Sequence, residues 1–113
     1  MLLMTTERGL SLPDPGPTAL SRQVAALRCG DSYLIVERTG ADEPAGDWYV
    51  QVRYLRDSER YQLEYRDGVP SEHYLAVTDS PAAVVGVLVG WSAGLPAWRR
   101  SLDWTPVGHW FTH

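Results

Sequence analysis

The fold is decided by WYVQVRYLRDSERYQLEYRDG, residues 48–68, in which two alternating segments flank a short polar turn. Within residues 48–55 every second side chain is apolar or aromatic, and the same period recurs in residues 60–66. A period of two places one row of side chains against a core and the other row in water, which is typical of a half-buried β-strand. Because only residues 56–59 separate the two segments, we expect them to pair as an antiparallel hairpin.

Two further strands are expected to flank this hairpin. Residues 33–38 are rich in β-branched and aromatic side chains, and residues 73–78 alternate again, with His73, Leu75 and Val77 expected on the buried face. Short links between consecutive strands imply that they are neighbours in the sheet. The sequence therefore predicts an α+β fold with an antiparallel four-stranded meander over about residues 33–78.

A C-terminal helix over about residues 80–93 is expected to pack on one face of the meander. Ser80 can cap its first turn, and Pro81 suits the first helical position. One apolar stripe follows at helical spacing, formed by Val84, Val87, Leu88 and Trp91. The valine-rich composition also allows a strand over residues 82–91, and the pattern alone leaves this alternative open.

The N-terminal part of the chain is expected to contribute little to the sheet. Residues 18–29 favour a short helix, because three leucine and valine side chains fall on one face, although a strand over residues 23–27 is the alternative. Residues 13–17 contain three prolines and a glycine, a cluster that fits neither a helix interior nor a central strand. We therefore expect residues 1–17 to be a flexible leader and residues 18–113 to be one domain.

Charge and cysteine content argue against several classes of function. The formal net charge is −4, and all ten basic residues are arginines interleaved with acids, so no basic stripe exists to hold a phosphate backbone. The single cysteine, Cys29, cannot form an intramolecular disulfide. No apolar run approaches the roughly 20 residues of a membrane span, and no signal peptide is visible. We expect a cytoplasmic protein without nucleic-acid or membrane partners.

One motif invites an enzymatic interpretation. Residues 90–94 match the Gly-x-Ser-x-Gly nucleophile elbow of α/β-hydrolases, and Asp103 and His109 follow in the order of that family. That fold needs a large parallel sheet, which this chain is too short to build around Ser92, so a small serine hydrolase ranks last among the functions considered. No histidine pair has metal-ligand spacing. We expect no catalytic residue, no metal and no cofactor.

The aromatic content is the most informative feature, because five tryptophans and six tyrosines are many for 113 residues. Tyrosine and arginine on a polar sheet face suit a partner-binding surface. The candidates for such a surface are Tyr49, Arg53, Gln62, Glu64 and Tyr74. On the core side, a curved sheet with a helix across it can enclose a small-molecule pocket. The candidates for that pocket are Trp48, Tyr54, Tyr61, Tyr65 and Trp91.

Several segments resemble a family of short uncharacterised actinobacterial α+β proteins: residues 61–68 (YQLEYRDG), His73-Tyr74, Gly90-Trp91 and residues 98–104 (WRRSLDW). The resemblance spans roughly residues 30–107 and implies a fold rather than an activity. In size and strand–helix order the chain is also similar to immunity proteins of polymorphic toxin systems, although architecture does not fix function.

These observations favour a non-enzymatic protein-binding module, immunity-type or chaperone-like, over an enzyme. A small-ligand-binding domain with an aromatic-lined pocket is the alternative. The partner is expected to be another protein, and an exposed edge strand would also allow a homodimer.

Overall fold

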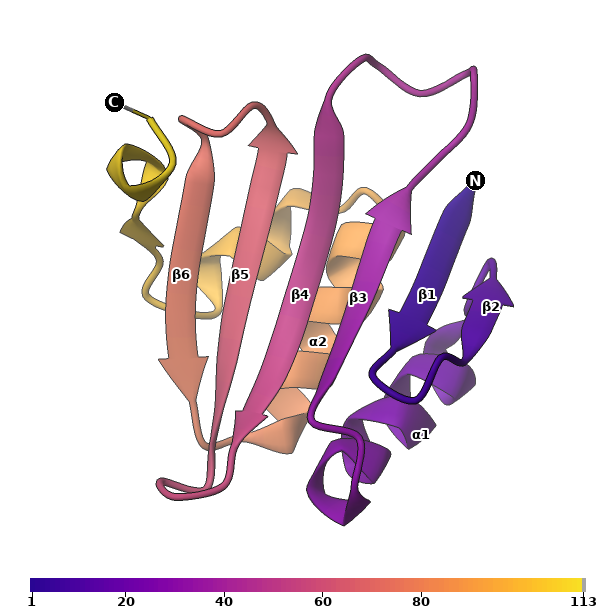
Figure 1. Ribbon diagram of the computed structural model, residues 1–113, viewed down its shortest axis with the longest axis vertical. Helices are drawn as coiled ribbons and strands as arrows, with labels where there is room; N and C mark the ends of the chain where they lie inside the picture. Colours follow the sequence, from indigo (N-terminus) through magenta and orange to yellow (C-terminus); the bar gives the residue numbers. More distant parts are fainter. Residues whose placement is uncertain (113) are drawn as a thin grey trace.

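The computed structural model describes residues 1–112 and contains one antiparallel sheet with two α-helices on the same side of it (Figure 1). The strands are β1 (Leu2–Thr6), β2 (Ser11–Pro13), β3 (Tyr33–Arg38), β4 (Asp47–Leu55), β5 (Arg60–Gly68), β6 (His73–Thr78) and β7 (Thr105–Pro106). The helices are α1 (Pro17–Ala26) and α2 (Pro81–Ser92), and the 3-10 turns are η1 (Leu27–Cys29), η2 (Pro96–Arg100) and η3 (Gly108–Trp110). The α+β class with an antiparallel sheet is therefore confirmed.

The sheet is wider than the four strands that the sequence predicts, because its order is β2-β1-β3-β4-β5-β6-β7. Its centre, β3 to β6, is the expected meander. Residues 1–17, expected to be a leader, instead supply β1 and β2, and β1 pairs along its whole length with β3. At the other end β7 pairs with β6. Both additions depend on contacts between segments that are distant in the sequence, which local periodicity does not reveal.

The two regions for which a strand remained an alternative are both helical. In α2, Ser80 Oγ accepts a hydrogen bond from the backbone N–H of Ala83 at 3.1 Å, and Pro81 occupies the first turn, as expected. α1 begins with Pro17 after a Gly16 cap, one residue before the expected start, and η1 continues it to Gly30, whose φ of 132° ends the turn.

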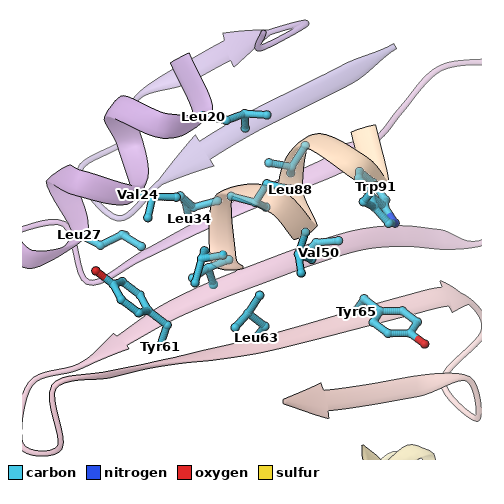
Figure 2. Packing of buried hydrophobic residues seen from close by; sticks show 14 of the residues in the cluster. Leu20, Val24, Leu27, Leu34, Val50, Tyr61, Leu63, Tyr65, Leu88 and Trp91 are labelled. Carbon is cyan, nitrogen blue, oxygen red and sulfur yellow. The ribbon is translucent and has the colours of Figure 1, made fainter. Parts of the chain in front are cut away.

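The core lies between the helices and the helix-facing rows of the sheet. Figure 2 shows Val24 of α1, Leu88 of α2 and Leu63 of β5 pointing toward one another, and all three are at most 1% exposed. Tyr61 lies at one end of this core, whereas Tyr65 and Trp91 lie at the other (Figure 2). The predicted stripe of α2 is the part of that helix buried here, namely Val84, Val87, Leu88 and Trp91.

The faces of β6 are the reverse of those expected. The register opposes Tyr65 to Tyr74 and Leu63 to Ala76, so the even-numbered side chains of β6 face the helices. His73, Leu75 and Val77 lie on the other side of the sheet. Both rows of β6 contain apolar side chains, so periodicity could not choose between them. The register set by the β5–β6 turn decides which row of β6 faces the helices.

Two glycines of α2 provide a matched test of this packing. A Cβ at Gly86 would meet nothing within 4 Å, whereas a Cβ at Gly90 would lie 2.9 Å from the Cβ of Trp98. We expect Gly86→Ala to stabilise the fold by about 0.5–1 kcal/mol, because alanine loses less backbone entropy in a helix. Gly90→Ala should instead destabilise it by roughly 1–3 kcal/mol through overpacking. Urea unfolding of both variants checks this, and equal stabilisation by both would contradict the close approach of η2 to α2.

Candidate functional site

One side of the sheet carries neither α1 nor α2, and we call it the open face (Figure 1). The strand registers place its side chains in three rows across the sheet. One row contains Leu3, Glu37, Tyr49, Arg66 and His73; the next contains Thr5, Ile35, Gln51, Glu64 and Leu75; the third contains Tyr33, Arg53, Gln62 and Val77. Four of the five predicted partner-binding residues, Tyr49, Arg53, Gln62 and Glu64, are therefore brought together here.

The fifth predicted residue, Tyr74, lies on the opposite side of the sheet because of the reversed phase of β6. Its ring stacks on that of Tyr65 with centroids 4.8 Å apart. Its hydroxyl donates a hydrogen bond to Glu72, and this bond raises the pKa of Tyr74. The open-face assignment of Tyr74 was wrong, and the residue that faces outward beside Arg66 is its neighbour His73.

His73 is the centre of a hydrogen-bonded network on the open face. Arg66 Nε donates to His73 Nδ1 at 3.1 Å, and His73 Nε2 lies 3.0 Å from Glu64 Oε1. Because arginine can only donate, Nδ1 must accept, so the ring hydrogen resides on Nε2 and is donated to Glu64. Both ring nitrogens are thus engaged, which makes the histidine a fixed structural element of the face rather than a free base.

The C-terminal turn covers this network. The ring of Phe111 lies 4.5 Å from that of His73, and the Arg66 guanidinium lies 4.9 Å from the centre of the Phe111 ring. His73 is consequently only 2% exposed, although Phe111 itself remains 42% exposed. Tyr49 also contacts His73 edge-on, and burial raises the pKa of Tyr49. Sequence reasoning missed Arg66 and Phe111, since no local pattern indicates that the chain end returns to this face.

Both edges of the sheet end in very short strands. β2 has three residues and β7 has two, and each includes a proline, which has no N–H to donate to an added strand. The exposed long edge strand on which the expectation of a homodimer rested is therefore absent from residues 1–112, because β1 and β6 are both paired on their outer sides.

A cleft of about 300 Å³ lies on the helix side, where α2 ends above the sheet. We call it the tryptophan cleft, and its lining residues are Arg38, Trp48, Asp67, Trp91, Gly94, Leu95, Pro96, Trp98 and Arg99. Of the five predicted pocket residues, Trp48 and Trp91 line it. No local pattern indicates that Arg38, Asp67, Trp98 and Arg99 share this lining, because β3, β5 and η2 meet only in the folded chain.

The remaining pocket candidates, Tyr54, Tyr61 and Tyr65, belong to the packed core instead. Tyr54 and Tyr61 contact each other with ring centroids 5.1 Å apart, and Tyr65 packs edge-on against Trp98 at 4.9 Å. Burial is the main cause that raises the pKa of Tyr61, and it raises the pKa of Tyr65 to about 12. These three side chains therefore fill space between the layers rather than enclose a cavity.

The Gly-x-Ser-x-Gly motif does not form a nucleophile elbow. Ser92 is the last residue of α2, whereas an elbow places the serine on a sharp turn between a strand and a helix. Its Oγ is buried and has no hydrogen-bond partner within residues 1–112, so no histidine activates it. Across the same residues, no three His, Cys, Asp or Glu side chains gather as a metal ion would require.

No family model, no curated protein and no solved structure matches the chain. Among residues 1–112, no helix combines the length and apolar character needed to cross a bilayer. The functional interpretation therefore depends on the geometry of the open face and of the tryptophan cleft.

The network implies that two glutamates of the open face contribute unequally to the stability of the fold. Glu64→Ala leaves the Nε2–H group of His73 buried without an acceptor, and we expect a loss of roughly 1–3 kcal/mol in the free energy of unfolding. Glu37→Ala is the matched control, because Glu37 makes no hydrogen bond or ion pair within residues 1–112, and it should change stability by less than about 0.5 kcal/mol. Equal losses in urea unfolding would contradict the proposed network.

The raised pKa of Tyr65 should make the stability of the fold depend on pH in the alkaline range. A tyrosine whose pKa is raised in the folded state contributes stability that is fully present below its unfolded pKa, about 10, and lost as the pH rises toward about 12. The chain contains no lysine, so tyrosines dominate the titration in that range. Tyr65→Phe should therefore lose less stability between these pH values than the parent protein does. Thermal unfolding at both ends of the range measures the difference, and parallel losses would refute it.

Proposed function

We propose that the chain is a non-enzymatic protein-binding module, of the immunity or chaperone-like type, that holds a basic protein partner against its open face. The observation that carries this proposal is the side of the seven-stranded sheet that neither α-helix covers, on which aromatic, arginine and polar side chains lie in continuous rows. The single cysteine is in keeping with a reducing compartment, and we propose that the protein acts in the cytoplasm.

The composition of the open face supports a role in recognition. Tyr49 and Arg53 are of the residue types that most often dominate binding energy, and they lie beside the polar Gln62 and Glu64. Val77, which is 44% exposed, and Phe111 at the margin add apolar area. The Glu64–His73–Arg66 network holds the β5–β6 part of this surface in one arrangement, so little side-chain entropy is lost there when a partner binds.

The edges of the sheet favour binding through its face. A partner that added a strand would need a long, exposed row of backbone donors and acceptors. β2 and β7 offer only three and two residues at the two edges. Recognition is then made by side chains of the broad face, which sets specificity through shape and charge rather than through backbone pairing.

The net charge supports a basic partner. A formal charge of −4 on a chain of this size attracts a positively charged protein from a distance and raises the rate of encounter. The likeness in size and strand–helix order to toxin-neutralising immunity proteins agrees with such a role, since they act by binding another protein. Ser92 has no activating partner among residues 1–112, and both His73 nitrogens are engaged, which supports a non-enzymatic function.

The proposal is tested with a photo-reactive amino acid at Gln51, in the middle of the open face. Irradiation in a lysate of the source organism should link this position to one basic protein, whereas the same residue placed at Ser21 on α1 should not capture it. The captured protein is then purified, and Arg53→Ala should weaken its binding about tenfold or more. Higher salt should slow association.

Arg22→Ala on the exposed side of α1 is the matched control, because it removes an arginine from the opposite side of the molecule and should leave the affinity unchanged. Capture from Ser21 rather than Gln51, or equal effects of Arg22→Ala and Arg53→Ala, would place the binding surface elsewhere. Capture of nothing specific from either position would reject the proposal.

A further inference from the structure

We infer that the tryptophan cleft is a binding site for a small planar monocarboxylate, with an aromatic ring between the indoles and its carboxylate on Arg38. This site lies on the helix side of the sheet, so it is independent of the protein-binding role proposed for the open face. Its volume of about 300 Å³ is at the lower end of the range typical of small-molecule sites, roughly 300–1,000 Å³.

Arg38 is the first reason for the inference. Its guanidinium lies 4.5 Å from the centre of the Trp91 ring and donates one hydrogen bond, 2.6 Å long, to the backbone carbonyl of Trp91. The side chain is half-buried, yet no carboxylate within residues 1–112 pairs with it. A guanidinium has several further N–H donors, and a half-buried charge is costly without a counter-charge. The geometry therefore leaves a place for an anion.

Arg99 and Asp67 set the charge that the ligand should carry. Arg99 pairs with Asp67 at 2.7 Å and lies over the ring of Trp98, so its charge is already compensated. Two guanidiniums and one carboxylate leave the cleft with one net positive charge. A single carboxylate neutralises the cleft, whereas a dianion would overcompensate it.

The walls of the cleft favour a flat ring. Trp48, Trp91 and Trp98 contribute three indoles to the lining from β4, α2 and η2, and an aromatic ring packs well against indoles in edge-to-face or offset contacts. Leu95 and Pro96 complete the apolar lining. A carboxylate can meet the planar guanidinium of Arg38 with two parallel hydrogen bonds, a geometry that also fixes the plane of an attached ring.

The site is tested with benzoate, its neutral analogue benzamide and the non-planar cyclohexanecarboxylate, each titrated into the full chain and followed by the NMR signals of the tryptophan indole N–H groups. Benzoate should shift the signals of Trp48, Trp91 and Trp98. Its dissociation constant should be about tenfold lower than that of benzamide, because only benzoate makes a charge-assisted pair. Cyclohexanecarboxylate should also bind less tightly than benzoate, since it cannot stack.

Variants separate the contribution of the charge on Arg38 from that of the aromatic lining. Arg38→Gln should abolish the preference for benzoate over benzamide, and Arg22→Gln on α1 is the matched control that should retain it. Trp48→Leu keeps both arginines and should weaken benzoate and benzamide alike. This second variant keeps the test decisive if Arg38→Gln, which removes a bond to the end of α2, fails to fold. Arg53→Ala on the open face should leave benzoate binding intact.

Equal affinities for benzoate and benzamide in the parent protein would overturn the inference, as would shifts confined to residues outside the cleft. Unchanged spectra at the highest soluble benzoate concentration would overturn it as well. None of these outcomes bears on capture of a protein partner at Gln51, so the failure of one proposal leaves the other standing.

Discussion

α2 packs on β4, β5 and β6, and the rest of the structure depends on this contact. Its buried side chains share one cluster with Val36, Val50 and Leu63, which have no exposed surface. Each such side chain contributes roughly 1.5–3 kcal/mol relative to its exposed state. Because α2 is apolar nearly all round, its flank also packs against α1, which draws α1 to the same side of the sheet. The placement of both helices follows from this one apolar segment.

The open face is a consequence of that arrangement. With both helices on one side, the other rows of the strands remain uncovered, and they contain polar, charged and aromatic side chains rather than a second core. His73 of β6 is the exception, because the C-terminal turn covers it. Without that turn His73 would be exposed. β7 and η3 bring Phe111 over it, and the close approach of Gly108 to the carbonyl of Ser71 leaves no room for a Cβ there. The His73 network is thereby held in place on the β5–β6 part of the open face.

The tryptophan cleft arises from a difference in length between α2 and the strand behind it. Twelve helical residues span about 18 Å, whereas the nine residues of β4 span about 30 Å. α2 runs roughly along β4 in Figure 1, so it ends before the sheet does. η2 lies at the remaining end, and its Trp98 and Arg99 line the cleft together with Trp48 and Asp67. Arg38 then caps the end of α2 from the sheet, which places one guanidinium where helix, sheet and turn meet.

The class of fold, the central meander from β3 to β6 and the grouping of Tyr49, Arg53, Gln62 and Glu64 on one face follow from the sequence alone, which also favoured a helix over a strand in both helical regions. Local signals suffice for these, because alternation, a capping serine and short turns act between residues that are near in the chain. Only the tertiary structure decided that residues 1–17 enter the sheet, that β6 shows His73 rather than Tyr74 to the open face, and that Arg38 and Arg99 share a cleft. In each case a pairing between distant segments outweighs a local pattern that is weak or satisfied equally by two arrangements.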